Sequence, residues 1–556
     1  MAIEDLWYKQ AVIYCLDVEK YMDANGDGVG DFEGLSRRLD YLSGMGVNCL
    51  WLQPFYPSPN KDNGYDISDY YGVHERHGNL GDFVEFMNHA RALGMRVIVD
   101  LVVNHTSVDH PWFQAARKDP RSPFRPYYVW SKERPHDHAD GIVFPGVQKT
   151  NWTWDEAAHA YYFHRFYDHQ PDLDTMNAEV RRELKKVMGF WLELGVSGFR
   201  MDAVPFLLER KGAGVEHSKD FELLHELRDF LQWRAGDAIL LGEANVPPSE
   251  SACYLGERGD RLQLMLNFPV NQRLFYALAT ADLGPLREAI AETSQRPPNA
   301  QWVNFLRSHD ELDLGRLTEE QRARVFLAFA PDQNMQLYDR GIRRRLAPIL
   351  GDDRRKLELA FSLLFSLPGT PMMQYGDEIG IGDDLSLPER ECARTPMQWT
   401  SERHGGFSIA EQVVRPVIAR GSYGYRSRNV ADQRRDNNSL LNWTERMIRM
   451  RKECRELSWG AISILPSSAD AVLVIEYAWR DAALLTLHNF SDVEQTVGFE
   501  VNTERGTTLV DVFGDDNSRA ESGRRHLVKL APYGYRWYRV GAVDNALHWA
   551  DRKPQS

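Results

Sequence analysis

The stretch LGDFVEFMNHARALGMRVIVDLVVNH, residues 80–105, joins the pattern of an amphipathic helix to that of a buried strand. Its first half repeats apolar residues every three to four positions as far as Leu93, and Gly94 stands where a helix should end. Its second half is almost continuously apolar and rich in Val and Ile, which is typical of a parallel strand covered on both faces. The stretch therefore predicts one helix-to-strand step of an α/β fold.

The same alternation recurs from residue 12 to residue 378, and it predicts the fold class. Eight strands alternating with helices indicate a parallel sheet, and eight is the number that closes a (β/α)8 TIM barrel. An open doubly wound sheet is the alternative. The expected strands are residues 12–18, 48–54, 95–105, 196–204, 238–245, 264–269, 301–311 and 370–378. The expected helices are residues 32–46, 80–94, 178–195, 221–233, 283–293 and 354–367.

Interruptions of this alternation predict the domain organisation. Residues 106–175, after the third strand, are rich in Pro, Trp, His and Tyr and are too long for a simple loop, so we expect an inserted subdomain. Residues 312–350 and 379–438 are further insertions, expected on the same face of the barrel. From residue 461 the pattern changes to six short alternating runs, which predict a C-terminal antiparallel β-domain. The predicted domains are the barrel in two parts (1–105 and 176–460), the inserted subdomain (106–175), a β-sandwich (461–541) and a tail (542–556).

Composition excludes several function classes. With 66 Lys and Arg against 80 Asp and Glu, the net charge is −14, which argues against nucleic-acid or anionic-membrane partners. No run approaches the ~18 apolar residues of a membrane span, and the first residues, MAIEDLWYKQ, do not resemble a signal peptide. The five cysteines are scattered without CxxC spacing, which favours reduced thiols in a cytoplasmic protein. A homo-oligomer is possible.

Polar residues gather where the expected strands end, and this is where a barrel places its active site. Arg200 and Asp202 are two residues apart, so their side chains leave the same side of a strand, and the Arg should keep the Asp ionised. Glycoside cleavage needs one attacking carboxylate, one protonated acid and negative charge near the oxocarbenium-like centre. The alternative is a set of structural polar groups. These residues are Asp100, Asn104 and His105, Arg200 and Asp202, Glu243, and His309 and Asp310.

Four segments resemble, in order and spacing, the characteristic segments of the α-amylase superfamily of glycoside hydrolases: DLVVNH (100–105), GFRMDAV (198–204), GEAN (242–245) and RSHDE (307–311). The resemblance implies that Asp202 is the nucleophile, Glu243 the acid/base and Asp310 the transition-state stabiliser. It implies that His105, Arg200 and His309 bind the glucosyl unit. It also implies that Asp66, in NGYDISDYY, grips the 4- and 6-hydroxyls of that glucose, and that Arg394, in ARTPMQW, pairs with Asp66 and closes the pocket.

Within the superfamily, HRFYDHQPDL (164–173), MDAVPFL (201–207) and RTPMQW (394–399) resemble the trehalose synthases, and this likeness adds Gln170 to the expected substrate-binding residues. It implies a retaining enzyme that interconverts maltose and trehalose by intramolecular transglucosylation, without an organic cofactor. An α-glucosidase or an intermolecular transglucosylase acting on small α-glucosides is the nearest alternative. A non-catalytic glucan-binding protein on the same barrel is an alternative from another class.

A second motif, DANGDGVGD (23–31), predicts a structural Ca²⁺ site. The side chains of Asp23, Asn25, Asp27 and Asp31 and the carbonyl of Val29 alternate as oxygen ligands around a glycine turn, which suits a hard cation. Gly34 stands where an EF-hand would need Glu, so the loop is not an EF-hand. A plain Asn/Asp/Gly turn is the alternative.

The likeness to trehalose synthases implies a second cation, which would tie the inserted subdomain to the barrel. Its expected ligands are Asn104, Asp172 and Glu209.

Overall fold

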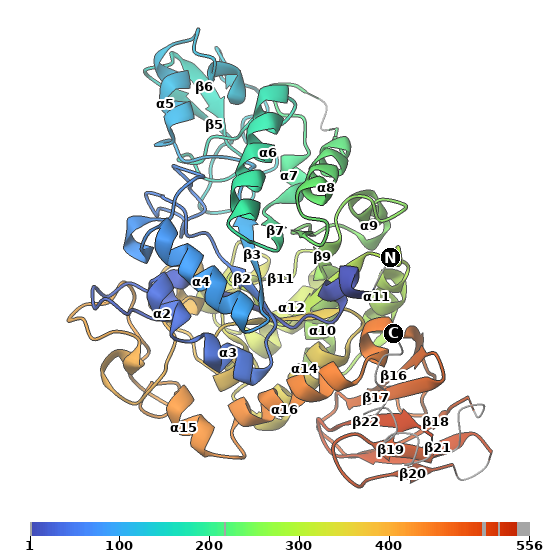
Figure 1. Cartoon of the computed structure of the whole chain (residues 1–556). Coiled ribbons are helices and arrows are strands. Elements are labelled where there is room, and N and C mark those ends of the chain that lie inside the picture. The colour runs from blue at the N-terminus through green and yellow to red at the C-terminus, as the bar shows by residue number, and fades with distance from the viewer. Residues whose placement is uncertain (1–2, 216–217, 503–507, 521–522, 542–556) are drawn as a thin grey trace.

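The computed structural model describes residues 3–215, 218–502, 508–520 and 523–541, and its centre is a closed barrel of eight parallel strands (Figure 1). The predicted barrel is confirmed, and an open sheet is excluded because the first strand pairs with the last. Around the barrel the strands follow chain order. They are β1 (Ile13–Leu16), β2 (Cys49–Leu52), β3 (Arg96–Leu101), β7 (Gly198–Met201), β8 (Ile239–Gly242), β9 (Leu264–Leu266), β10 (Gln301–Phe305) and β14 (Thr370–Gln374).

Side chains alternate between two cores along these strands, as the period of two requires. In β1, Ile13 and Cys15 point into the barrel interior, whereas Tyr14 and Leu16 pack against the surrounding helices. Each strand is shorter than its predicted run. Asp202 and Glu243 therefore directly follow the last residues of β7 and β8, at the carboxyl-terminal end of the barrel.

Helices surround the barrel largely as predicted. The expected helix at 32–46 is split at Arg37 and Arg38, and the short helices α1, α7 and α9 were not predicted. Nor was α10, between β9 and β10, whose first residues lie within the run 264–269 that the sequence predicts as a strand. Gly46 ends α3 with a φ of +98°, which favours glycine. The helices here are α1 (Val18–Tyr21), α2 (Phe32–Ser36), α3 (Leu39–Met45), α4 (Leu80–Ala92), α6 (Ala178–Glu193), α7 (Val204–Leu207), α8 (Glu222–Arg234), α9 (Pro248–Leu255), α10 (Phe268–Thr280), α11 (Gly284–Ser294) and α14 (Arg354–Ser366).

The segment after β3 forms a separate lobe, at the top of Figure 1. It contains α5 (Pro111–Lys118) and a small antiparallel sheet in the order β4-β6-β5, made of Trp130–Ser131, Ala160–Phe163 and Trp152–Asp155. The lobe returns to the barrel where His105 pairs with Asp172 in an isolated bridge. The carboxyl-terminal end of β3 is thus joined directly to the lobe.

Two further insertions follow β10 and β14. The first holds α12 (Glu319–Phe329) and a sheet of β11 (Leu312–Asp313), β13 (Gly341–Ile342) and β12 (Gln336–Leu337), before α13 (Leu346–Ile349). The second contains the 3-10 turns η5 (Asp377–Ile379), η6 (Glu389–Ala393) and η7 (Arg403–Gly406), then α15 (Val430–Arg435). Both bring side chains back to the carboxyl-terminal end of the barrel, as described below.

The C-terminal domain follows α16 (Leu440–Glu453) and α17 (Glu456–Trp459), and it consists of two antiparallel sheets around their own core. It packs on α14, where the indole nitrogen of Trp537 donates to Ser362 Oγ at 3.0 Å. β15 and β20 were not among the six predicted runs, and the predicted tail 542–556 lies outside the described residues. The strands are β15 (Ala461–Ile464), β16 (Val472–Trp479), β17 (Ala482–Asn489), β18 (Gln495–Glu500), β19 (Thr508–Asp511), β20 (Ser518–Arg519), β21 (Arg525–Leu530) and β22 (Tyr535–Val540).

Among the described residues, no helix has both the length and the apolar character needed to cross a membrane.

Candidate active site

One guanidinium group holds two of the predicted catalytic carboxylates. Arg200 Nη1 lies 2.6 Å from Asp202 Oδ1, and Arg200 Nη2 lies 2.7 Å from Glu243 Oε2. The Arg200 side chain is 1% exposed, while those of Asp202 and Glu243 are 12% and 23% exposed. The two carboxylates are therefore held by a buried cation, while part of each remains exposed at the carboxyl-terminal end of the barrel.

The register of the barrel explains this arrangement. Arg200 on β7 lies opposite Asp100 on β3, and its Nη1 also contacts Asp100 Oδ1 at 2.6 Å. Trp51 on β2 donates from its indole nitrogen to Asp100 Oδ2 at 3.0 Å. Ionic hydrogen bonds of this kind fix a buried arginine in one rotamer, so the carboxylates it holds are preorganised.

The backbone between the two carboxylates is strained. Ala203, directly after Asp202, has a φ of +48°, a left-handed conformation that costs a non-glycine residue on the order of 1 kcal/mol. In this conformation its N–H donates to Glu243 Oε2 at 3.1 Å. The left-handed conformation thus turns the chain sharply after Asp202 and directs the N–H of Ala203 toward the carboxyl of Glu243.

Burial raises the pKa of Glu243 to about 7. The positive charge of Arg200 lowers this pKa, whereas the negative charges of Asp202 and Asp310 raise it further. Burial also raises the pKa of Asp202, to about 6, again against Arg200. Both pKa values are raised, that of Glu243 more than that of Asp202, so the pair can hold one proton near neutral pH. A protonated acid beside an ionised carboxylate is the combination that retaining glycoside cleavage uses.

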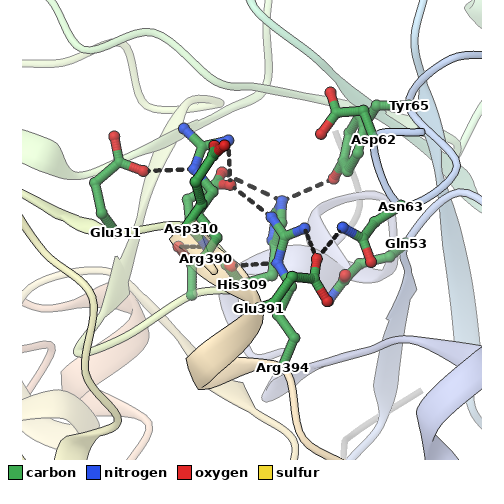
Figure 2. Close-up of polar contacts among 12 residues, drawn as sticks. Gln53, Asp62, Asn63, Tyr65, His309, Asp310, Glu311, Arg390, Glu391 and Arg394 are labelled. Atoms are coloured by element: carbon green, nitrogen blue, oxygen red, sulfur yellow. Dashed lines mark hydrogen bonds and ion pairs between the residues drawn. The ribbon is translucent and has the colours of Figure 1, made fainter. Parts of the chain in front are cut away.

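Asp310, the third predicted carboxylate, lies between two arginines and a histidine (Figure 2). Its Oδ1 lies 2.9 Å from Arg390 Nη1 and 3.1 Å from Arg394 Nη2, and His309 Nε2 lies 3.2 Å from its Oδ2. Burial alone would raise the pKa of Asp310, but Arg390, His309 and Arg394 together hold it well below its usual value. Asp310 therefore remains ionised. Arg390, whose Nε also contacts Glu311 at 2.6 Å, was missed in the sequence because nothing in its spacing links it to the barrel.

Tyr65 is a second residue that the sequence reasoning missed. Its hydroxyl lies 2.8 Å from His309 Nε2, and its ring stacks on the His309 ring with centroids 5.6 Å apart. The Arg200 guanidinium lies 5.9 Å from the Tyr65 ring centroid. Tyr65 thus connects the two charged clusters, and the sequence signal for it is its place in the segment NGYDISDYY, directly before Asp66.

The structure corrects the role expected of Asp66. This carboxylate is fully buried and accepts hydrogen bonds from Ser58 Oγ (2.9 Å), the Lys61 N–H (3.0 Å) and the Asp62 N–H (3.1 Å). It closes a turn and is saturated by that turn, so the predicted pair with Arg394 is not formed. Arg394 instead contacts Asp310, Glu391 and the carbonyl of His309.

Asp62, in the same turn, lies where Asp66 was expected. It is partly exposed and stands beside Tyr65 in Figure 2. Burial raises its pKa to about 7, against the neighbouring charges of Arg390 and Arg394. Gln170 is fully buried and donates to Asp62 Oδ2 at 2.8 Å, so its observed contact is with this carboxylate. His105 is also buried, and its Nε2 lies 3.0 Å from the Tyr65 carbonyl.

The second predicted cation site does not fit a metal ion. Lys211 Nζ lies 2.8 Å from both Asn104 Oδ1 and Asp172 Oδ2, and Glu209 is paired with Arg165 Nη2 at 2.7 Å. An ammonium group therefore stands among the expected ligands. Nor does any group of three His, Cys, Asp or Glu side chains within the described residues have an arrangement that could hold a metal.

The loop 23–31 offers oxygen ligands of the type that Ca²⁺ prefers, and burial raises the pKa of Asp31, with the nearby Asp23 charge adding to the rise. Backbone donors already engage both groups: Gly28 N–H contacts Asp23 Oδ2 at 2.8 Å, and Gly34 N–H contacts Asp31 Oδ1 at 2.6 Å. The loop therefore has the types of ligand that Ca²⁺ takes, but its carboxylates are not arranged around a metal position in this structure, and calcium at this loop stays a prediction.

Comparisons with known proteins agree with this geometry. Residues 16–331 and 339–460 match the model of the α-amylase catalytic domain, and residues 482–539 match that of the sucrose hydrolase-like C-terminal domain. The chain is 43% identical to a trehalose synthase of Thermus thermophilus, over 99% of this chain but only 57% of that protein. It is 40% identical to a trehalose synthase of Pimelobacter sp. over 97% of both chains. A solved structure of a trehalose-6-phosphate hydrolase of Bacillus licheniformis shares the fold, with a TM-score of 0.77. It is 23% identical to this chain, and the match covers 96% of this chain and 100% of that one. The chain belongs to the α-amylase family of enzymes.

Proposed function

We propose that this enzyme interconverts maltose and trehalose by intramolecular transfer of a glucosyl unit. The observation that carries the proposal is the Asp202–Arg200–Glu243 arrangement, in which one guanidinium holds two carboxyls and the pKa of Glu243 is raised to about 7, together with an ionised Asp310. Relatives named trehalose synthase, similar over nearly the whole of this chain, support the choice of substrate.

In the first half of the reaction, an Asp202 carboxylate oxygen attacks C1 of the non-reducing glucose of maltose. The bond from C1 to the glycosidic oxygen breaks, and Glu243 gives its proton to that oxygen. The products are a glucosyl ester of Asp202, ionised Glu243 and one free glucose. Asp310 stabilises the positive charge that develops at C1, because its cations keep it ionised.

In the second half, the free glucose turns within the site and presents its anomeric hydroxyl. Glu243 takes the proton of that hydroxyl, and the oxygen attacks C1 and displaces Asp202. The new bond joins the two anomeric carbons, which gives trehalose, and both carboxyls return to their starting states. Water at the same position would give glucose instead, so the glucosyl ester must be kept from solvent.

A clasp between the three insertions supports the retention of the free glucose. We use the word clasp for Tyr167, Tyr338 and Glu389, whose two hydroxyls lie 2.9 Å and 2.6 Å from Glu389 Oε2. Phe144 stacks on Tyr167 with ring centroids 4.8 Å apart, and the Arg390 guanidinium lies 5.2 Å from the Phe144 ring centroid. Since Arg390 also contacts Asp310, a chain of contacts links the clasp to this catalytic carboxylate.

The test is product analysis from maltose in the presence of ¹³C-labelled free glucose. Intramolecular transfer predicts mostly unlabelled trehalose. Labelled trehalose or longer oligosaccharides would indicate an intermolecular transglucosylase, and glucose alone would indicate an α-glucosidase. Turnover that persists in an Asp202→Asn variant would refute the covalent mechanism.

The proposal includes a structural Ca²⁺ held by Asp23, Asn25, Asp27, the Val29 carbonyl and Asp31. Such an ion would steady the loop before α2, and it would take no part in the glucosyl transfer. Chelation should therefore lower the melting temperature while the product distribution stays the same. A wild-type protein that binds no calcium, by metal analysis, would remove this part of the proposal.

A further inference from the structure

Lys211 has a buried ammonium group surrounded by oxygen atoms. Its Nζ lies 2.8 Å from Asp172 Oδ2, 2.8 Å from Asn104 Oδ1, 3.1 Å from the Leu173 carbonyl and 3.2 Å from the Asn104 carbonyl. The Lys211 side chain is 2% exposed, and that of Asp172 is fully buried. Such a set of carboxylate, amide and backbone oxygens is also what a hard cation takes from a protein.

These oxygens come from the junction between the barrel and the inserted lobe. Asn104 follows β3 and precedes His105, whereas Asp172 and Leu173 lie where the chain returns from the lobe. The Leu173 N–H donates to the Asn104 carbonyl at 2.9 Å, and Asn104 Nδ2 donates to Asp172 Oδ2 at 3.1 Å. Lys211 therefore binds both chain segments of the junction from one side.

The junction has no carboxylate oxygen left for a metal ion. Asp172 Oδ1 accepts from the Arg165 N–H at 2.8 Å, and its Oδ2 is shared by Lys211 and Asn104. Glu209 is engaged by Arg165 Nη2. A divalent ion bound to the same oxygens would stand next to the ammonium group, where repulsion between unscreened charges is strongest.

We propose that Lys211 is the built-in cation of this junction and takes the place of a metal ion there. The junction is consequently independent of metal supply, and any calcium dependence of the enzyme arises elsewhere. Removal of the ammonium group should leave a cage of four oxygens, with the charge of Asp172, that accepts Ca²⁺. This inference does not depend on the proposed reaction, because it concerns only the junction.

Two variants separate charge from bulk. Lys211→Ala empties the cage, while Lys211→Met fills most of the same space without charge and serves as the matched control. Both should lower the melting temperature in chelator, on the order of 3 °C for a chain of this size, because Asp172 loses its buried partner. Added Ca²⁺ should restore stability to Lys211→Ala, with one more calcium bound per chain than in wild type, and should not restore Lys211→Met.

The wild-type protein supplies a test that does not depend on variants folding. Crystals grown with Ca²⁺ or Tb³⁺ should show no anomalous peak beside Asp172, whatever the loop 23–31 binds. A peak at that position would overturn the proposal. So would a Lys211→Ala variant that is stable in chelator and gains no calcium.

Discussion

Removing the Glu389 carboxylate should convert part of the isomerase activity into hydrolysis. In Glu389→Ala, the hydroxyls of Tyr167 and Tyr338 lose their shared acceptor. A hydrogen bond to a charged group contributes ~1.5–3 kcal/mol when buried, but Glu389 is partly exposed, so about 1 kcal/mol each is appropriate. The closed state should then lose about 2 kcal/mol, and the open fraction should rise by up to ~30-fold.

The assay is the ratio of glucose to trehalose formed from maltose at early times. We expect the ratio to rise by up to ~30-fold in Glu389→Ala and by about 5-fold in Tyr167→Phe or Tyr338→Phe, each of which loses one of the two hydrogen bonds to Glu389 together with the long contact between the two hydroxyls. Glu389→Gln keeps an acceptor and should change the ratio less. Glu402→Ala, an exposed residue of the same insertion, is the matched control. An unchanged ratio in Glu389→Ala, with normal folding, would refute the link between the clasp and water exclusion.

The remaining predictions concern the charged groups of the site. Asp202→Asn should lose all detectable turnover with an unchanged circular dichroism spectrum; a variant with substantial activity would exclude Asp202 as the nucleophile. Because the pKa of Glu243 is raised in the folded state, its contribution to stability is present below pH ~4 and is lost as the pH rises through about 7. Glu243→Gln should therefore gain stability relative to wild type between pH 5 and pH 8, by up to about 3 kcal/mol in urea unfolding; a pH-independent difference would contradict the raised pKa. Asp62→Asn should impair turnover of maltose with little change in melting temperature, whereas Asp66→Asn should mainly destabilise the fold; the reverse pattern would restore the role first expected of Asp66.

The sequence predicted the barrel well because its signals are local. Each strand is a short apolar run, and Asp202 and Glu243 directly follow such runs, whereas Asp310 lies a few residues beyond Phe305, the last residue of β10. The helix α10 was missed because its first residues, Phe268 and Pro269, lie within the apolar run 264–269 that predicts a strand. The choice between Asp62 and Asp66 could not be made, since both lie in one turn and only the turn's hydrogen bonds decide which carboxylate is saturated.

Lys211 and Arg390 could not be predicted for a different reason. Each acts on a segment far away in the chain, Arg390 on Asp310 and Lys211 on Asn104, and neither contact leaves a spacing pattern. The expected metal at Asn104 and Asp172 shows the same limit. The likeness to trehalose synthases implied that Asn104 and Asp172 hold a cation, but it could not show that the cation beside them is a side chain of the same protein.

The clasp also restricts how this enzyme can be recombined with its relatives. Its three residues come from three separate insertions, one after β3, one after β10 and one after β14. A chimaera that receives one of these insertions from a relative keeps the other two, whose clasp residues fit the insertion that was replaced. Successful exchange should therefore require all three segments to move together, although the barrel between them stays in place. The three insertions thus form one structural unit, although they are separate in the sequence.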